Sequence, residues 1–200
     1  ALFRNLCAVL VLFSLQEIPA QNRFSKSQVL EDLNFLKASL ETTHYNLYAY
    51  TPKKEFVRNF NAVRASVKKD SLSLLEATSL FQRVISKANN GHTGIDFPGQ
   101  SYLVYAYGGG TVFPLELAFE DGRALVRKNW SGKDSIETGS EVLGINGVPI
   151  AEILEHIYPQ VSAERPYFKN AKIEVYSFPR YFWLVYGPKD RFTVRIRSGS

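Results

Sequence analysis

Residues 139–150 constrain the fold of this chain more than any other stretch. They read Gly-Ser-Glu-Val-Leu-Gly-Ile-Asn-Gly-Val-Pro-Ile, and the dipeptide Asn146-Gly147 is strongly favoured in two-residue hairpin turns. The alternating apolar residues before this dipeptide predict a strand. Apolar residues then follow at the spacing of one helix face: Ile150, Ile153, Leu154 and Ile157. The segment therefore predicts a β-hairpin that leads directly into a helix.

Three amphipathic helices are predicted in the first half of the chain. The first covers residues 27–42, and the sequence Ser-Lys-Ser-Gln at 25–28 fits a capping box before it. The second begins at Thr51-Pro52, a capping residue followed by the residue type preferred at the first helical position. The third begins at Ser73, with Glu76 three residues later, and runs to about residue 88. Together they predict a helical subdomain over residues 21–100.

The composition changes after residue 100. Residues 101–130 are rich in tyrosine, valine, leucine and phenylalanine, and Asp121-Gly122 between two apolar runs predicts a second hairpin. The three glycines at 108–110 are interpreted as a turn between two strands. Residues 191–197 alternate polar and apolar side chains, which predicts a half-buried strand. We therefore expect an α+β chain whose second part, residues 101–200, is a β module.

The size and charge of the chain exclude some function classes. Its 200 residues are 45% hydrophobic and 22% charged, which suffices for a buried core and argues against disorder of the whole chain. The formal charge of +5 is scattered, with adjacent lysines at 53–54 and at 68–69. We interpret these pairs as solvated surface, and no nucleic-acid partner is expected.

The first twenty residues have the pattern of a secretory signal peptide. Arg4 precedes a nearly uninterrupted apolar run at 6–15, and Ala20 offers a small residue at a cleavage point. The run is shorter than the roughly 20 apolar residues that a spanning helix needs. The pattern predicts a secreted or periplasmic protein, with an uncleaved membrane anchor as the alternative. The single cysteine, Cys7, lies in this segment, so the cleaved chain would form no disulfide.

No common hydrolase or metal-site motif occurs in the sequence. It contains no G-x-S-x-G, no H-E-x-x-H and no paired histidines at ligand spacing, so neither a metal nor a cofactor is expected. Of the three histidines, His44 and His156 are interpreted as structural or solvent-facing side chains. His92 lies between Gly91 and Gly94, which we expect to leave its imidazole accessible. From spacing alone, a general-base role and a structural role for His92 both stay open.

The order of these motifs resembles the first half of a tail-specific, or C-terminal-processing, serine peptidase. The resemblance covers about residues 30–196 and depends chiefly on Gly-His-Thr at 91–93 and the hairpin sequences at 115–126 and 139–150. It is greater to the tricorn-like branch. It implies a PDZ-like β module, a polypeptide substrate, and a serine nucleophile in a later αβ domain that is absent from this chain. It also implies that His92 is the general base that accepts the serine proton.

A PDZ-like module implies a defined peptide-binding surface. Such modules add an extended peptide as a strand at a sheet edge, and the resemblance implies substrate contacts from Phe113, Leu115, Leu117 and Ile153. The loop before the edge strand usually offers backbone N–H groups to a peptide carboxylate, but here it contains Pro114, which has none. Whether the module binds C-terminal carboxylates therefore stays open.

Three functions are consistent with these observations. The leading hypothesis is the N-terminal part of a secreted serine endopeptidase that positions a polypeptide substrate and supplies the general base. The alternative is a stand-alone PDZ-like peptide-binding module in which His92 is structural. The third is a purely structural envelope protein. The sequence predicts neither the identity of the substrate nor the oligomeric state.

Overall fold

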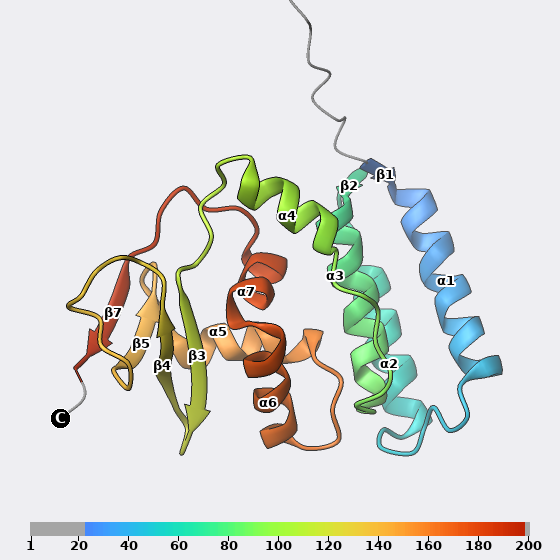
Figure 1. Ribbon diagram of the computed structural model, residues 1–200. Helices are drawn as coiled ribbons and strands as arrows, with labels where there is room; N and C mark the ends of the chain where they lie inside the picture. Colours follow the sequence, from blue (N-terminus) through green and yellow to red (C-terminus); the bar gives the residue numbers. More distant parts are fainter. Residues whose placement is uncertain (1–22, 199–200) are drawn as a thin grey trace, which may run out of the picture.

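The three helices predicted in the first half of the chain are present, and we call the region that they form the helical subdomain. The computed structural model describes residues 23–198, and the predicted signal peptide at 1–20 lies outside them. The subdomain contains α1 (Lys26–Thr43), α2 (Lys53–Ala65) and α3 (Leu74–Ile85), with the short 3-10 helix η1 (Ser86–Ala88) after α3. Two short strands, β1 (Arg23–Ser25) and β2 (Ser71–Ser73), pair antiparallel where α1 and α3 begin (Figure 1).

Two capping boxes define where α1 and α3 begin, as the sequence predicts. The Ser25 hydroxyl accepts a hydrogen bond from the Gln28 N–H, and the Gln28 side chain accepts one from the Ser25 N–H. Ser73 and Glu76 make the same reciprocal pair at α3. Each box satisfies two N–H groups that the first helical turn would otherwise leave without partners.

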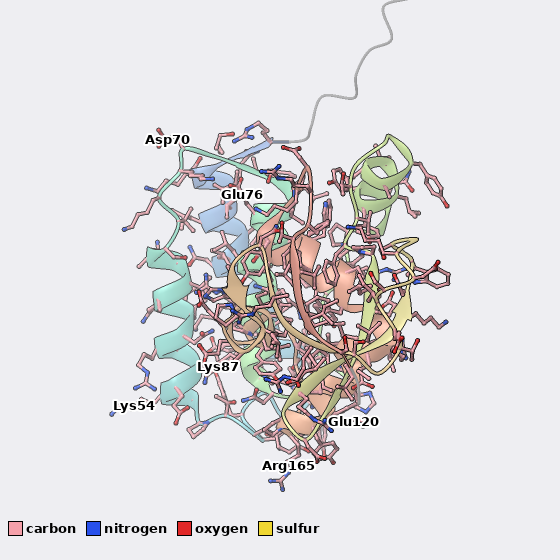
Figure 2. The ribbon with its side chains drawn as sticks, turned by 90° about the vertical axis from the view of Figure 1, so that its left-hand side faces the viewer. Lys54, Asp70, Glu76, Lys87, Glu120 and Arg165 are labelled. Atoms are coloured by element: carbon pink, nitrogen blue, oxygen red, sulfur yellow. The ribbon has the colours of Figure 1, made fainter. Side chains whose placement is uncertain are left out.

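Apolar side chains from all three helices form the core of this subdomain. Its largest buried members include Val29, Leu33, Phe56, Phe60, Val63, Leu80 and Val84. Charged side chains lie outside this core, and Figure 2 shows Lys54 of α2 directed away from the body of the protein. All four paired lysines at 53–54 and 68–69 are exposed, which agrees with the interpretation of these pairs as solvated.

Both predicted hairpins are confirmed in the β module. The antiparallel sheet has the order β3 (Leu115–Glu120), β4 (Arg123–Asn129), β5 (Glu141–Ile145) and β6 (Val148–Pro149), and β7 (Val194–Arg197) also pairs with β5. At the turn between β3 and β4, φ is 50° for Asp121 and 76° for Gly122. At the turn between β5 and β6, φ is 50° for Asn146 and 83° for Gly147. Positive φ at both central residues is the type I′ geometry that these dipeptides favour.

Residues 99–107 form a helix, and the predicted strand there is wrong. This helix, α4 (Gly99–Tyr107), lies between the helical subdomain and the β module in Figure 1. A continuous apolar run does not distinguish a helix from a buried strand. Here Tyr102 and Tyr105, one helical turn apart, both contact the ring of Trp183, with centroid separations of 5.2 and 5.9 Å. The three glycines that follow end this helix and do not separate two strands.

The helix predicted after the second hairpin is present, and two further helices follow it. The predicted helix is α5 (Ile150–Ile157), continued by the 3-10 helix η2 (Tyr158–Gln160). The two further helices are α6 (Pro166–Tyr176) and α7 (Phe178–Tyr186), joined through Ser177 at φ 84°. Figure 1 shows α5, α6 and α7 between the sheet and the helical subdomain.

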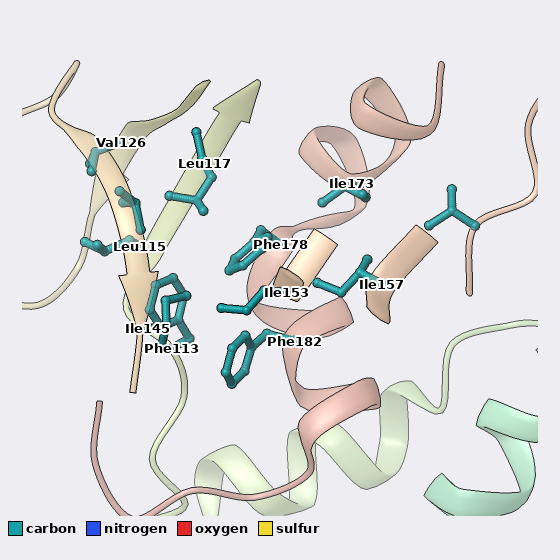
Figure 3. Close-up of a cluster of buried hydrophobic side chains, with 13 residues drawn as sticks. Phe113, Leu115, Leu117, Val126, Ile145, Ile153, Ile157, Ile173, Phe178 and Phe182 are labelled. Carbon is teal, nitrogen blue, oxygen red and sulfur yellow. The ribbon is translucent and has the colours of Figure 1, made fainter. Parts of the chain in front are cut away.

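Helix α7 packs against both the sheet and α5. Phe178 and Phe182 of α7 belong to the same buried cluster as strand residues such as Leu115, and Figure 3 shows the α5 residue Ile153 between the two rings. Phe113 stacks on Phe182 with a centroid separation of 5.7 Å and meets the Phe178 ring edge-on at 5.4 Å. The mixed helix and sheet architecture agrees with the α+β expectation.

The four predicted substrate contacts are core residues. Phe113 is 3% exposed, and Leu115, Leu117 and Ile153 are fully buried. The resemblance implied substrate contacts from these residues, and helices α6 and α7, which pack against this part of the sheet, were not predicted. In this arrangement no peptide can reach these four side chains.

The edge of β3 is also occupied. Phe119 is not hydrogen-bonded to β4 through its N–H, because residues next to the closing pair of a two-residue hairpin direct their N–H outward. That N–H donates to Glu174 Oε1 of α6 at 2.8 Å. A side chain of the same chain therefore takes one position that an added peptide strand would use.

We expect Phe178→Ala to destabilise the fold by about 3 to 5 kcal/mol, because it removes a fully buried ring and leaves a cavity. Urea unfolding followed by circular dichroism measures this change. The control is Val175→Ala on α6, where the side chain is 75% exposed and the change should stay within about 0.5 kcal/mol. Equal, small effects of both substitutions would contradict the packing of α7 in the core through Phe178.

Candidate functional site

The Gly-His-Thr turn lies where the two parts of the chain meet. It follows η1, and Asn89 ends that helix in the left-handed conformation, with φ 51°. From there the chain runs along the connection between α5 and α6, to which Asn90 and Gly91 are hydrogen-bonded through Ser162 and Glu164. His92 is exposed, and its side chain lines a cavity of about 380 Å³. Residues 91–97 form one wall of this cavity, and residues of α3, α6, α7 and the segment 160–162 form the others.

Most backbone N–H groups of the turn already have partners. The acceptors are Ser162 Oγ for Asn90, Glu164 Oε1 for Gly91, Asn90 Oδ1 for His92, Asn90 O for Thr93 and Gln82 Oε1 for Ile95, at 2.8 to 3.2 Å. These bonds fix the backbone of the turn. They also leave these N–H groups unavailable to an oxyanion of a substrate.

Side chains of α6 and of the segment before it form hydrogen bonds with the backbone of Gly91. The Gly91 N–H donates to Glu164, and the Gly91 carbonyl accepts from Lys172 Nζ. Lys172 also donates to the Ser162 carbonyl at 2.9 Å. A Cβ at position 91 would lie 2.6 Å from Phe168 Cε1. A side chain at position 91 would therefore require the Phe168 ring of α6 to move, and the φ of Gly91 is not positive.

The charges around Gly91 follow from these contacts. The hydrogen bond from the Gly91 N–H is the main cause that lowers the pKa of Glu164, so the carboxylate is ionised at neutral pH. Burial lowers the pKa of the Lys172 ammonium, while the Glu164 charge raises it. Burial also raises the pKa of Tyr181, which lines the cavity, to about 12. The Tyr181 phenol is therefore protonated and can donate a hydrogen bond.

His44 supports the turn from the helical subdomain. Its Nε2 lies 2.8 Å from Thr93 Oγ1, and its Nδ1 accepts from the Asn46 N–H at 3.1 Å. Because Nδ1 is an acceptor, the neutral ring carries its proton on Nε2 and donates to Thr93. The sequence interpretation of His44 as structural agrees with this contact. Its link to the Gly-His-Thr turn spans 49 residues, and no local pattern signals it.

The imidazole of His92 differs from the other two. Among residues 23–198, neither ring nitrogen of His92 has a hydrogen-bond partner, whereas His156 Nδ1 lies 2.7 Å from the Tyr186 hydroxyl. Within the same residues, no group of three histidine, cysteine or acidic side chains could hold a metal ion. None of the helices in the described part combines the length and apolar character needed to cross a bilayer.

The fold is similar to that of CPAF, a chlamydial serine protease with a tail-specific protease-like fold. A CPAF mutant with serine replaced by alanine matches with a TM-score of 0.55 and 19% identity, over 86% of this chain and 31% of that chain. Mature CPAF complexed with lactacystin gives a TM-score of 0.53 and 17% identity, over 86% and 32%. Mature CPAF gives 0.50 and 19%, over the same shares.

The chain thus spans about one third of the length of these structures. At such low identities the likeness shows the fold alone. No protein-family model matches the sequence, and no curated protein matches it.

We expect the protection of the Gly91 amide from hydrogen exchange to fall at acidic pH. The pKa of Glu164 is lowered in the folded state, so its contribution is complete above the unfolded pKa and is lost as the pH falls through the lower, folded pKa. Exchange measured by NMR between pH 7 and pH 3, corrected for the intrinsic rate, checks this. The Ile95 amide, which donates to the uncharged Gln82, is the internal control.

Glu164→Gln should remove this pH dependence, because the amide still accepts a hydrogen bond but cannot titrate. Glu155→Gln on the exposed side of α5 is the matched control and should retain it. An unchanged profile in the Glu164 variant would contradict the assigned contact.

Proposed function

We propose that this chain is the N-terminal part of a secreted serine endopeptidase related to the tail-specific proteases, and that it supplies the general base, His92. The observation that carries the proposal is the His92 imidazole. It is exposed at a cavity, and its ring nitrogens have no hydrogen-bond partner among residues 23–198. The turn that carries it is hydrogen-bonded both to His44 of the helical subdomain and to Glu164 before α6. The likeness of the fold to a serine protease supports the same reading.

In the proposed reaction, His92 accepts the proton of a serine hydroxyl as its oxygen attacks the peptide carbonyl carbon. The same proton then passes to the amine nitrogen as the carbon–nitrogen bond breaks, and water repeats the sequence to release the acyl group. A fixed turn serves this task, since a general base must lie within hydrogen-bond reach of the proton it moves.

The N–H groups of the turn indicate that this chain supplies the general base but not the oxyanion donors. Five of them donate within the chain, so the donors for the tetrahedral oxyanion come from elsewhere. We assign those donors and the serine to a further αβ domain. A histidine without these groups cannot stabilise the tetrahedral intermediate.

The alternative function, a stand-alone PDZ-like peptide-binding module, has less support. Its groove would lie between β3 and α5, where Phe178 and Phe182 are packed. At the edge of β3, the Phe119 N–H already donates a hydrogen bond to Glu174. We therefore assign substrate positioning to the cavity beside His92 in place of the groove.

In the complete polypeptide that contains this chain, we expect His92→Ala to lower peptide hydrolysis by about 10³-fold or more, because one member of a catalytic unit is lost. Hydrolysis of a casein substrate and labelling of the serine by a fluorophosphonate measure the effect. His156→Ala is the control, since His156 bonds to Tyr186 and does not line the cavity. Full activity of the His92 variant would overturn the proposal.

The 200-residue chain alone should show no peptide hydrolysis and no fluorophosphonate labelling. The physical reason is the missing nucleophile and oxyanion donors. Mass spectrometry of the chain after incubation with the probe, and a fluorescent casein assay, check this expectation. Hydrolysis that depends on His92 in the isolated chain would show that a serine of this chain is the nucleophile.

A further inference from the structure

The cavity beside His92 contains two cationic side chains from neighbouring helices. Lys172 of α6 and Arg180 of α7 both line it, together with the aromatic residues Phe97, Tyr176 and Tyr181. Among residues 23–198, neither cation lies within 4.0 Å of a carboxylate oxygen. Cations without an ionic partner in a partly enclosed cavity attract anionic ligands.

Arg180 is arranged to bind a planar anion. Its guanidinium lies over the ring of Phe97, 5.8 Å from the centroid. This cation–π contact favours the position of the charged group at the cavity. A guanidinium edge matches the two oxygens of a carboxylate in a bidentate pair.

Lys172 fixes the other side of the same cavity. Its ammonium donates to the carbonyls of Gly91 and Ser162 and lies over the ring of Phe168, 5.4 Å from the centroid, and its positive charge faces the cavity that it lines. The protonated Tyr181 phenol adds a neutral donor to the lining.

Two carboxylates of the chain lie near these cations. Glu164 interacts with Lys172 through space, but its Oε1 accepts the Gly91 N–H and it does not line the cavity. Asp96 lines the cavity and is exposed. The Asp96 charge opposes an incoming anion, and so removing it should strengthen binding.

We propose that this cavity binds a carboxylate of the polypeptide substrate, held by Arg180 and Lys172 close to His92. The inference rests on the proposed function and names a substrate preference for that site. The carboxylate belongs either to an acidic side chain or to the C-terminus of the bound polypeptide. Binding here would place the acidic residue next to the general base and not in the space filled by α7.

The test is an NMR titration of the 200-residue chain with three acetylated pentapeptides. The first peptide has four alanines around a central glutamate and an amidated C-terminus. The second has glutamine in place of that glutamate and is also amidated. The third consists of five alanines and has a free C-terminal carboxylate. We expect at least one carboxylate peptide to bind about tenfold more tightly than the glutamine peptide, with shifts at residues 91–97. The peptide that shows the preference identifies the source of the carboxylate.

Arg180→Gln should abolish this preference, because the exposed guanidinium is removed without disturbing the core. Asp96→Asn should increase the affinity for the same peptide severalfold. Lys54→Gln, on the outer face of α2 (Figure 2), is the matched control and should change nothing. Thermal unfolding verifies that each variant is folded.

Equal binding of all three peptides by the folded chain, or a preference that survives Arg180→Gln, would overturn this inference. Neither result would contradict the proposed function. That proposal fails only if the complete polypeptide hydrolyses peptides without His92. The two proposals can therefore fail independently.

Discussion

The packing of Phe178 and Phe182 against the sheet and α5 is the interaction on which the rest of the structure depends. These rings connect the inner face of β3 to Ile153 and hold α7 in the β module. Because α6 is joined to α7 through a single residue, Ser177, the same packing fixes α6. Glu164, just before α6, and Lys172, within α6, then form hydrogen bonds with the Gly-His-Thr turn. A hydrophobic contact in the β module thus sets the geometry of a polar turn at the edge of the helical subdomain.

That turn combines rigid backbone with a free side chain. Hydrogen bonds from both parts of the chain satisfy its N–H groups, and His44 holds the hydroxyl of Thr93. The ring nitrogens of His92 have no hydrogen-bond partner among the described residues. A proton-transfer group needs this combination, since its position must be fixed while its nitrogen atoms remain available. A histidine that only stabilised the turn would be expected to use its ring nitrogens as His44 does.

The sequence predicts what local physics determines. The capping boxes at Ser25 and Ser73 and the type I′ turns at Asp121 and Asn146 depend on residues within three positions of one another, and each is present in the structure. The strand predicted at residues 101–107 is a helix because its tyrosines pack on Trp183, about 80 positions away in sequence, and this contact overrides an ambiguous apolar run.

Long-range contacts explain the remaining differences. Helix α7 was not predicted, and its packing places Leu115, Leu117 and Ile153, the expected substrate contacts, in the core. The close approach of the Phe168 ring to Gly91 also joins residues that are far apart in the sequence. The contacts of Gly91 with Glu164 and Lys172 likewise cross more than 70 residues.

The central claim is that His92 acts on a serine outside this chain, and one distance tests it most directly. A crystal structure of the complete polypeptide, with its reactive serine phosphonylated, would locate that serine oxygen relative to the His92 ring. The account predicts a ring nitrogen within about 3.2 Å of the serine oxygen or of a phosphonate oxygen. A reactive serine paired with a different histidine or with a lysine, and distant from His92, would contradict it.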